Sequence, residues 1–147
     1  MKAAFRIWVT IVFAAALTQV AFAGYGAFYA ADKVSDSSID ENTFEDGFGL
    51  HAGFGYLVVL GGLVLLILAL IARPGGTALK QSAIVFGLLI LQVLLAWFGG
   101  EIPAIGAFHP VNAFIIVGLL GAMTAHQWRA NKMGMRSEPA SAPPPAA

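Results

Sequence analysis

The sequence predicts an all-α protein: a four-helix transmembrane bundle with up-down-up-down topology and both termini in the cytoplasm. Composition gives the class. Hydrophobic residues make up 59% of the 147 residues and charged residues only 11%, whereas a soluble domain carries about 25% charged residues. The chain lacks the polar surface needed to cover itself in water. We therefore expect a multi-pass protein of the inner (plasma) membrane, with the lipid bilayer as its surroundings.

Four long apolar runs predict the four helices. Each run reaches or exceeds the length of about 20 residues that crosses the hydrocarbon layer, and in lipid the backbone must satisfy its own hydrogen bonds, which favours helices. The runs cover about 7–31, 47–72, 81–100 and 103–128. They form one expected domain, residues 1–130. Residues 131–147 are rich in Pro and Ala, which predicts a disordered cytoplasmic tail.

The first apolar run resembles a signal peptide, because Ala21-Phe22-Ala23 has the form of a cleavage site. Its apolar character continues beyond that site to Ala31, and a signal sequence has an apolar region of only about 7–15 residues. We therefore interpret the run as a helix that is retained.

Basic residues predict the orientation, since they gather on the cytoplasmic side of membrane helices. They flank the start of the first run, the 73–80 loop and the end of the fourth run: Lys2, Arg6, Arg73, Lys80, Arg129, Lys132 and Arg136. The 32–46 loop holds six acidic residues and is expected outside. The net charge is zero, which gives no reason to expect nucleic-acid binding.

The sequence lacks the residues and motifs that several kinds of site require. The chain has no cysteine, which excludes disulfides, thiolate metal sites and cysteine catalysis. It also has no phosphate-binding loop, HExxH, GxSxG or dinucleotide-binding motif. With no catalytic residue to name, we do not expect an enzyme.

Two histidines are expected at the same depth. His51 lies 22 positions before Arg73, and His109 lies 20 positions before Arg129, which correspond to roughly 33 and 30 Å of helix. The second and fourth helices are parallel, and both open with glycine and histidine and end near a basic residue. The two imidazoles can therefore face each other near the outer face.

A facing imidazole pair across an apolar slot suits a haem iron, so we expect one haem b with His51 and His109 as metal ligands, for electron transfer. A flat haem needs small residues in its walls. Gly55 lies on the face of His51, and Asn112 and Ala113 follow His109 by one helical turn. A ligating histidine also needs an acceptor for its second N–H, which the sequence does not identify.

Other interpretations stay open. The histidines can be interfacial or structural in a cofactor-free accessory or structural subunit, or bind zinc at the outer face together with Glu45, Asp46 and Glu101. Gln19 and Gln92 are expected to bond helix to helix, or to line a cofactor or quinone cavity. The sequence also leaves open a membrane redox partner and a homo- or hetero-oligomer.

Three motifs carry a resemblance to a known family: FEDGFGLHAGFGYLVVL, LQVLLAWFG and AFHPVNAFIIVG. They resemble an uncharacterised bacterial family of four-helix membrane proteins, over roughly residues 5–130. The architecture is also similar to transmembrane b-type cytochromes and to half of haem A synthase. That resemblance implies axial histidines on the helices of a bundle, here His51 and His109. His126 lies beside Trp128 and Arg129, and we expect it at the cytoplasmic interface.

Overall fold

The computed structural model of the protein describes residues 1–34 and 41–137, with side chains for all of these except 41 and 134–137. Every element in these ranges is a helix. The elements are α1 (Lys2–Val34), α2 (Glu41–Ala72), α3 (Gly76–Glu101), α4 (Pro103–Gly106) and α5 (Phe108–Ser137).

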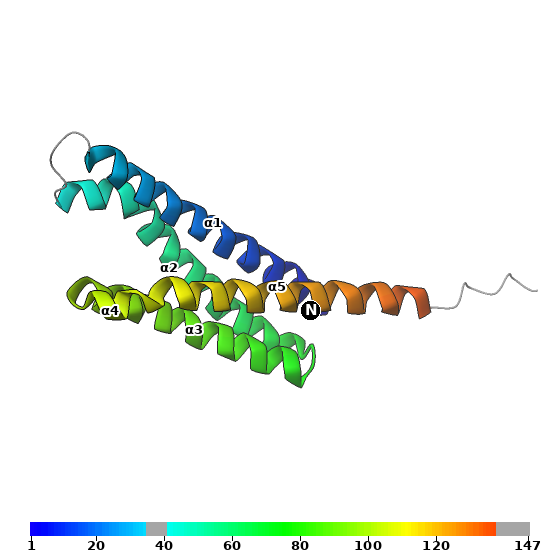
Figure 1. The fold of residues 1–147 in the computed structure, drawn as a ribbon. Helices are drawn as coiled ribbons and strands as arrows, with labels where there is room; N and C mark the ends of the chain where they lie inside the picture. The colour runs from blue at the N-terminus through cyan, green and yellow to red at the C-terminus, as the bar shows by residue number, and fades with distance from the viewer. Residues whose placement is uncertain (35–40, 138–147) are drawn as a thin grey trace, which may run out of the picture.

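The predicted all-α class is confirmed, with four helices that are long and apolar enough to cross a membrane. Consecutive long helices run antiparallel (Figure 1). The helices extend beyond the apolar runs, and α5 continues well past residue 128, so residues 131–137 of the expected tail are helical. The rest of that tail, residues 138–147, and residues 35–40 of the acidic loop lie outside the described residues.

The turn between α2 and α3 follows from proline and glycine. A residue before proline avoids the right-handed helical conformation, and Arg73 has a φ of 45°, the left-handed conformation that ends many helices. Pro74 cannot continue the hydrogen-bond ladder. Gly75 has a φ of 125°, which only glycine adopts readily, and α3 begins directly after it.

The fourth apolar run is not one helix, because α4 and α5 are separated at Ala107. Pro110 explains the separation. In an uninterrupted helix its ring would collide with the carbonyl of Gly106, and it has no N–H to donate to that carbonyl. Ile102, just before Pro103, is extended with φ −130° and ψ 95°, which ends α3 and reverses the chain direction.

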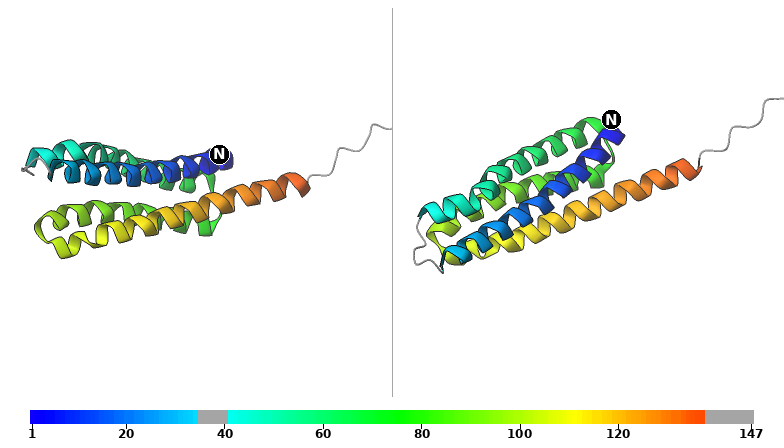
Figure 2. Two further views of the ribbon diagram at one scale, coloured as in Figure 1. Left: turned by 45° about the horizontal axis from the view of Figure 1, so that its top comes forward. Right: turned by 90° about the horizontal axis from the view of Figure 1, so that it is seen from above.

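The bundle consists of two helical hairpins, α1–α2 and α3–α5, which lie as two layers (Figure 2). The hairpins meet near the 73–75 turn and diverge toward the end that carries α4 (Figure 1). The buried core lies in the half nearer the turn, and its most completely enclosed hydrophobic side chains are Phe5, Val9, Leu65, Val85, Leu120 and Met123. Retention of residues 1–23 stays a prediction, which the burial of Phe5 and Val9 favours.

The two hairpins repeat each other. Four buried positions of α1 recur as buried positions of α3 after a shift of 73 residues, the shift that also relates Gln19 to Gln92: Phe5, Val9, Val12 and Ala16. Three buried positions of α2 recur in α5 after a shift of 58, the shift that also relates His51 to His109: Val58, Gly62 and Leu65. The sequence repeats with them: Ile-Val-Phe at 11–13 and 84–86, Gln-Val at 19–20 and 92–93, Ala at 23 and 96, and Gly at 26 and 99. The fold therefore has an internal pseudo-two-fold relation.

Glycines at equivalent positions bring each hairpin together near the α4 end. A Cβ added to Gly26 would lie 2.7 Å from the ring of Phe48, and a Cβ added to Gly99 would lie 2.6 Å from the Cα of Gly106. Real Cβ atoms do not approach other atoms so closely. The second contact is between backbones, so no side-chain rotation can relieve a substitution there.

We therefore expect Gly99→Ala to destabilise the bundle by about 1–3 kcal/mol, the usual effect of overpacking a close contact. The measurement is the unfolding midpoint of the purified protein in detergent. Gly100→Ala is the matched control, because no atom lies within 4 Å of the Cβ it would add. Equal midpoints for the two variants would contradict the close-contact interpretation.

Candidate functional site

Gln19 and His51 are joined by two hydrogen bonds between α1 and α2. The side-chain Nε2 of Gln19 donates to the carbonyl oxygen of His51 at 2.6 Å. In return, the ring Nδ1 of His51 lies 3.1 Å from the carbonyl oxygen of Gln19. Each residue thus uses its side chain to bind the backbone of the other. We call this reciprocal pair a glutamine–histidine clasp.

The second hairpin contains the same clasp. The Nε2 of Gln92 donates to the carbonyl oxygen of His109 at 3.0 Å, and the Nδ1 of His109 lies 3.1 Å from the carbonyl oxygen of Gln92. The two clasps occupy equivalent positions of the repeat. Both glutamines therefore bond from helix to helix, as one of the sequence-based interpretations expected.

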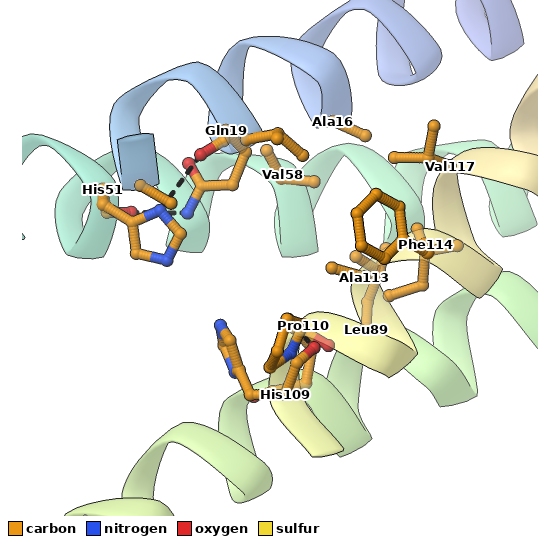
Figure 3. A pocket seen from close by; sticks show the side chains of 14 residues that line it. Ala16, Gln19, His51, Val58, Leu89, His109, Pro110, Ala113, Phe114 and Val117 are labelled. Atoms are coloured by element: carbon orange, nitrogen blue, oxygen red, sulfur yellow. Dashed lines mark hydrogen bonds between the residues drawn. The ribbon is translucent and has the colours of Figure 1, made fainter. Parts of the chain in front are cut away.

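The clasps determine which ring nitrogen carries the proton. A carbonyl oxygen only accepts hydrogen bonds, so the Nδ1 of each neutral imidazole must be the protonated nitrogen. Each Nε2 then presents a lone pair. Neither Nε2 has a hydrogen-bond partner among the described residues, and His51 and His109 point toward each other across the space between the hairpins (Figure 3). Their ring centroids are 6.0 Å apart.

Two cavities meet at this histidine pair. One, of about 150 Å³, extends toward α1 and α5, and the other, of about 280 Å³, extends toward α2 and α3. The residues that line both are Gln19, His51, Val58, Leu89, Gln92 and His109. The remaining lining is almost entirely apolar. Together the cavities form a slot that crosses the bundle between the hairpins.

The slot ends where the packed core begins. Val58 and Leu89 line both cavities and are themselves buried members of the core. On the far side, toward the α4 end, the hairpins diverge (Figure 1). The histidines therefore lie just beyond the end of the packed core, where the two cavities meet.

Asn112 supports the second clasp from outside the slot. It is buried and lines neither cavity, and its Nδ2 donates to the Oε1 of Gln92 at 2.6 Å and to the carbonyl oxygen of Leu88 at 2.9 Å. The equivalent position in the first hairpin is Phe54, which packs against the ring of Phe22. The Oε1 of Gln19 is correspondingly buried without a partner in the part of the chain described here.

The other residues named from the sequence divide between the slot and its surroundings. Gly55 lines the α2–α3 cavity, and a Cβ there would lie 2.9 Å from the Nε2 of Gln19. Ala113 lines the α1–α5 cavity. His126 is exposed near the other end of α5 and takes no part.

The sequence did not identify the acceptors of the histidine N–H groups, which are the backbone carbonyls of Gln19 and Gln92. It also placed Asn112 in the cavity wall, whereas the side chain supports Gln92. The signal for the clasps was present in the sequence as the repeated Gln-Val at 19–20 and 92–93. Each of these pairs is followed by a histidine in the next long helix.

The fold and the site define a class. Four long apolar helices, joined by side-chain-to-backbone bonds in their interior, are those of a multi-pass helical membrane protein. Residues 19–100, more than half of the chain, match the family of unknown function DUF6220, and the chain belongs to that family. The matched segment contains Gln19, His51 and Gln92 and ends before His109. The expected membership of an uncharacterised family is confirmed.

No curated protein and no solved structure matches the chain.

Replacement of Asn112 by Leu should destabilise the bundle by about 1 kcal/mol, because the Oε1 of Gln92 and the carbonyl of Leu88 lose their donor. The unfolding midpoint in detergent measures the effect. The matching control is a double-mutant cycle with Gln92→Leu, in which the combined loss should be smaller than the sum of the two single losses. Additive losses would show that Asn112 does not act through Gln92.

Proposed function

We propose that the protein binds one haem b between its two hairpins, with His51 and His109 as the axial ligands, and that it transfers electrons in the membrane. One observation carries the proposal. Two unprotonated imidazole nitrogens face the same slot, and the described residues offer neither of them a donor. One electron-pair acceptor placed between the two nitrogens can bind both lone pairs, and a metal ion is such an acceptor.

The spacing of the rings supports a shared metal. A metal–imidazole bond is about 2 Å long, so two rings that bind one ion from opposite sides have centroids roughly 6 Å apart. The observed value is 6.0 Å. The Nδ1–H of each histidine is also oriented by a carbonyl oxygen, the arrangement in which a ligating histidine is usually held.

The shape of the slot favours a flat, largely apolar group over a bare ion. The two cavities extend in opposite directions from the histidine pair, and together they reach the lower part of the range of about 300–1,000 Å³ that ligand sites occupy. His51 and His109 would hold such a group, and the apolar residues of the two cavities would contact it on either side of the histidine pair.

When bound, haem supplies a one-electron redox centre whose potential depends on its axial ligands and on the polarity around it. The residues of the chain contribute the rest. The clasps hold both imidazoles in the ligating tautomer, and Val58 and Leu89 exclude water on the side of the core. Ala113 and Gly55 have small side chains, which leave room in the slot. The partner would be a membrane redox protein or a quinone.

The two alternatives have weaker support. A structural zinc site needs four protein ligands. Among the residues whose side chains the structure describes, 1–34 and 42–133, no group of three or more His, Asp or Glu lies close enough to hold a metal ion. A cofactor-free accessory subunit would use the clasps only as helix-to-helix bonds. That alternative leaves the opposed lone pairs of His51 and His109 without a role.

The first test is the absorption spectrum of protein purified from cells supplied with haem. Low-spin haem b bands are expected in the reduced-minus-oxidised difference spectrum. His51→Ala and His109→Ala should each abolish them, since each removes an axial ligand. His126→Ala, which changes an exposed histidine on the same helix as His109, should leave the spectrum unaltered. A flat spectrum for the unsubstituted protein would overturn the haem proposal.

We further propose that the termini and the 73–75 turn face the cytoplasm and that the histidine pair lies near the outer face of the inner membrane. Because the chain has no cysteine, single cysteines can report the orientation. In intact cells, a membrane-impermeant thiol reagent should label Asp46→Cys and not Thr77→Cys; both positions are exposed. The reverse pattern would invert the assignment.

A further inference from the structure

The two ends of the slot differ in their hydrogen-bonding groups. The α2–α3 cavity is lined by Tyr56 from α2 and Trp97 from α3, two side chains that each carry a polar donor on a large apolar ring. They are 65% and 75% exposed. Among the described residues neither the Tyr56 hydroxyl nor the Trp97 indole N–H has a hydrogen-bond partner.

The repeat makes the difference specific. The position equivalent to Tyr56 is Phe114, which lines the α1–α5 cavity, and the position equivalent to Trp97 is Gly24. Apart from the glutamines and histidines that both cavities share, the lining of the α1–α5 cavity has no side-chain donor. The two halves of the slot are lined from equivalent positions of the repeat. Beyond the glutamines and histidines that both halves share, only the α2–α3 half has side chains that can donate hydrogen bonds to the edge of a ligand.

We propose that the carboxylate edge of the haem lies in the α2–α3 cavity and accepts hydrogen bonds from the Tyr56 hydroxyl and the Trp97 indole N–H. The inference rests on the proposed haem site and adds the direction in which the ring lies. The opposite, hydrocarbon edge then lies against Phe114 and Ala113 in the α1–α5 cavity. Tyr56 and Trp97 fix the orientation of a ring that the two clasps alone would hold either way round.

Two physical arguments support this direction. Side chains on helices lean toward the N-terminus of their helix, so Tyr56 leans toward the level of His51 and Trp97 toward the level of Gln92. In addition, a carboxylate near hydrocarbon is costly unless it is hydrogen-bonded. Neither cavity is lined by a Lys or Arg, so the neutral donors of Tyr56 and Trp97 are what the lining offers a carboxylate.

The test compares two probes on the full chain prepared without haem: haemin, and haemin dimethyl ester, in which both carboxylates are blocked. Tyr56→Phe should weaken haemin binding about tenfold, the effect of one hydrogen bond to a charged group. It should leave binding of the ester unchanged. Trp97→Phe should act in the same direction. Tyr25→Phe is the control, since Tyr25 is half-exposed on α1 and lines neither cavity.

The outcomes separate the two proposals. If the unsubstituted protein binds neither probe, the haem site itself is wrong, and the orientation falls with it. If it binds haemin through both histidines but Tyr56→Phe and Trp97→Phe bind haemin as tightly as Tyr25→Phe does, only the orientation is wrong. An equal loss for haemin and its ester would assign Tyr56 to packing and would likewise overturn the carboxylate contact.

A swap of the two equivalent residues gives a second readout. Tyr56→Phe combined with Phe114→Tyr moves the hydroxyl to the other cavity without changing the rest of the slot. Because Trp97 still donates in the α2–α3 cavity, we expect the double variant to bind haemin in both directions, seen as a second set of haem methyl resonances in the NMR spectrum of the oxidised protein. An unchanged set of resonances would show that the hydroxyl does not select the direction.

Discussion

A backbone carbonyl on a neighbouring helix fixes which nitrogen of each half-buried imidazole carries the proton, and the site depends on that constraint. In lipid, a glutamine or a histidine must find its partners within the protein. Each clasp satisfies one side chain with the backbone of the other residue and ties two helices at a defined depth. Because Nδ1 is committed to a carbonyl, Nε2 is left as an acceptor. One pair of bonds thus stabilises the hairpin and prepares a ligand.

The arrangement of the bundle follows from where its close contacts lie. Side chains interlock between the hairpins from the 73–75 turn to the level of Val58 and Leu89, which holds that half of the bundle together. At the other end, the close glycine contacts are within each hairpin, Gly26 with Phe48 and Gly99 with Gly106. The helices of a hairpin are therefore held together while the hairpins themselves diverge. The two cavities lie at the level where the histidines point.

The sequence predicts much of this fold because membrane helices need long apolar runs, and the depth of the histidines can be counted from flanking arginines. The break at Ala107 is also implied by Pro110, although the apolar run appears continuous. What the residues cannot reveal is contact with backbone: the carbonyls of Gln19 and Gln92 look the same in a sequence as any others. For this reason the role of Asn112 is also hidden, since the residue reaches Gln92 rather than the slot. The spacing of the repeat could have been read, because Ile-Val-Phe and Gln-Val recur with one constant shift.

The repeat has a consequence for how such a protein can arise. A unit of two helices enters and leaves the membrane on the same side, so a second copy joined after it is inserted the same way up. Duplication of an ancestral hairpin therefore brings two histidines to one depth without any adjustment of topology, whereas a duplicated unit of three helices would be inverted. In a fused pair the two copies can also differ in sequence, as Tyr56 and Phe114 do at one pair of equivalent positions and Phe54 and Asn112 at another. A fused pair can thus have different residues on the two sides of its site, whereas two identical chains related by symmetry must have the same residues on both sides.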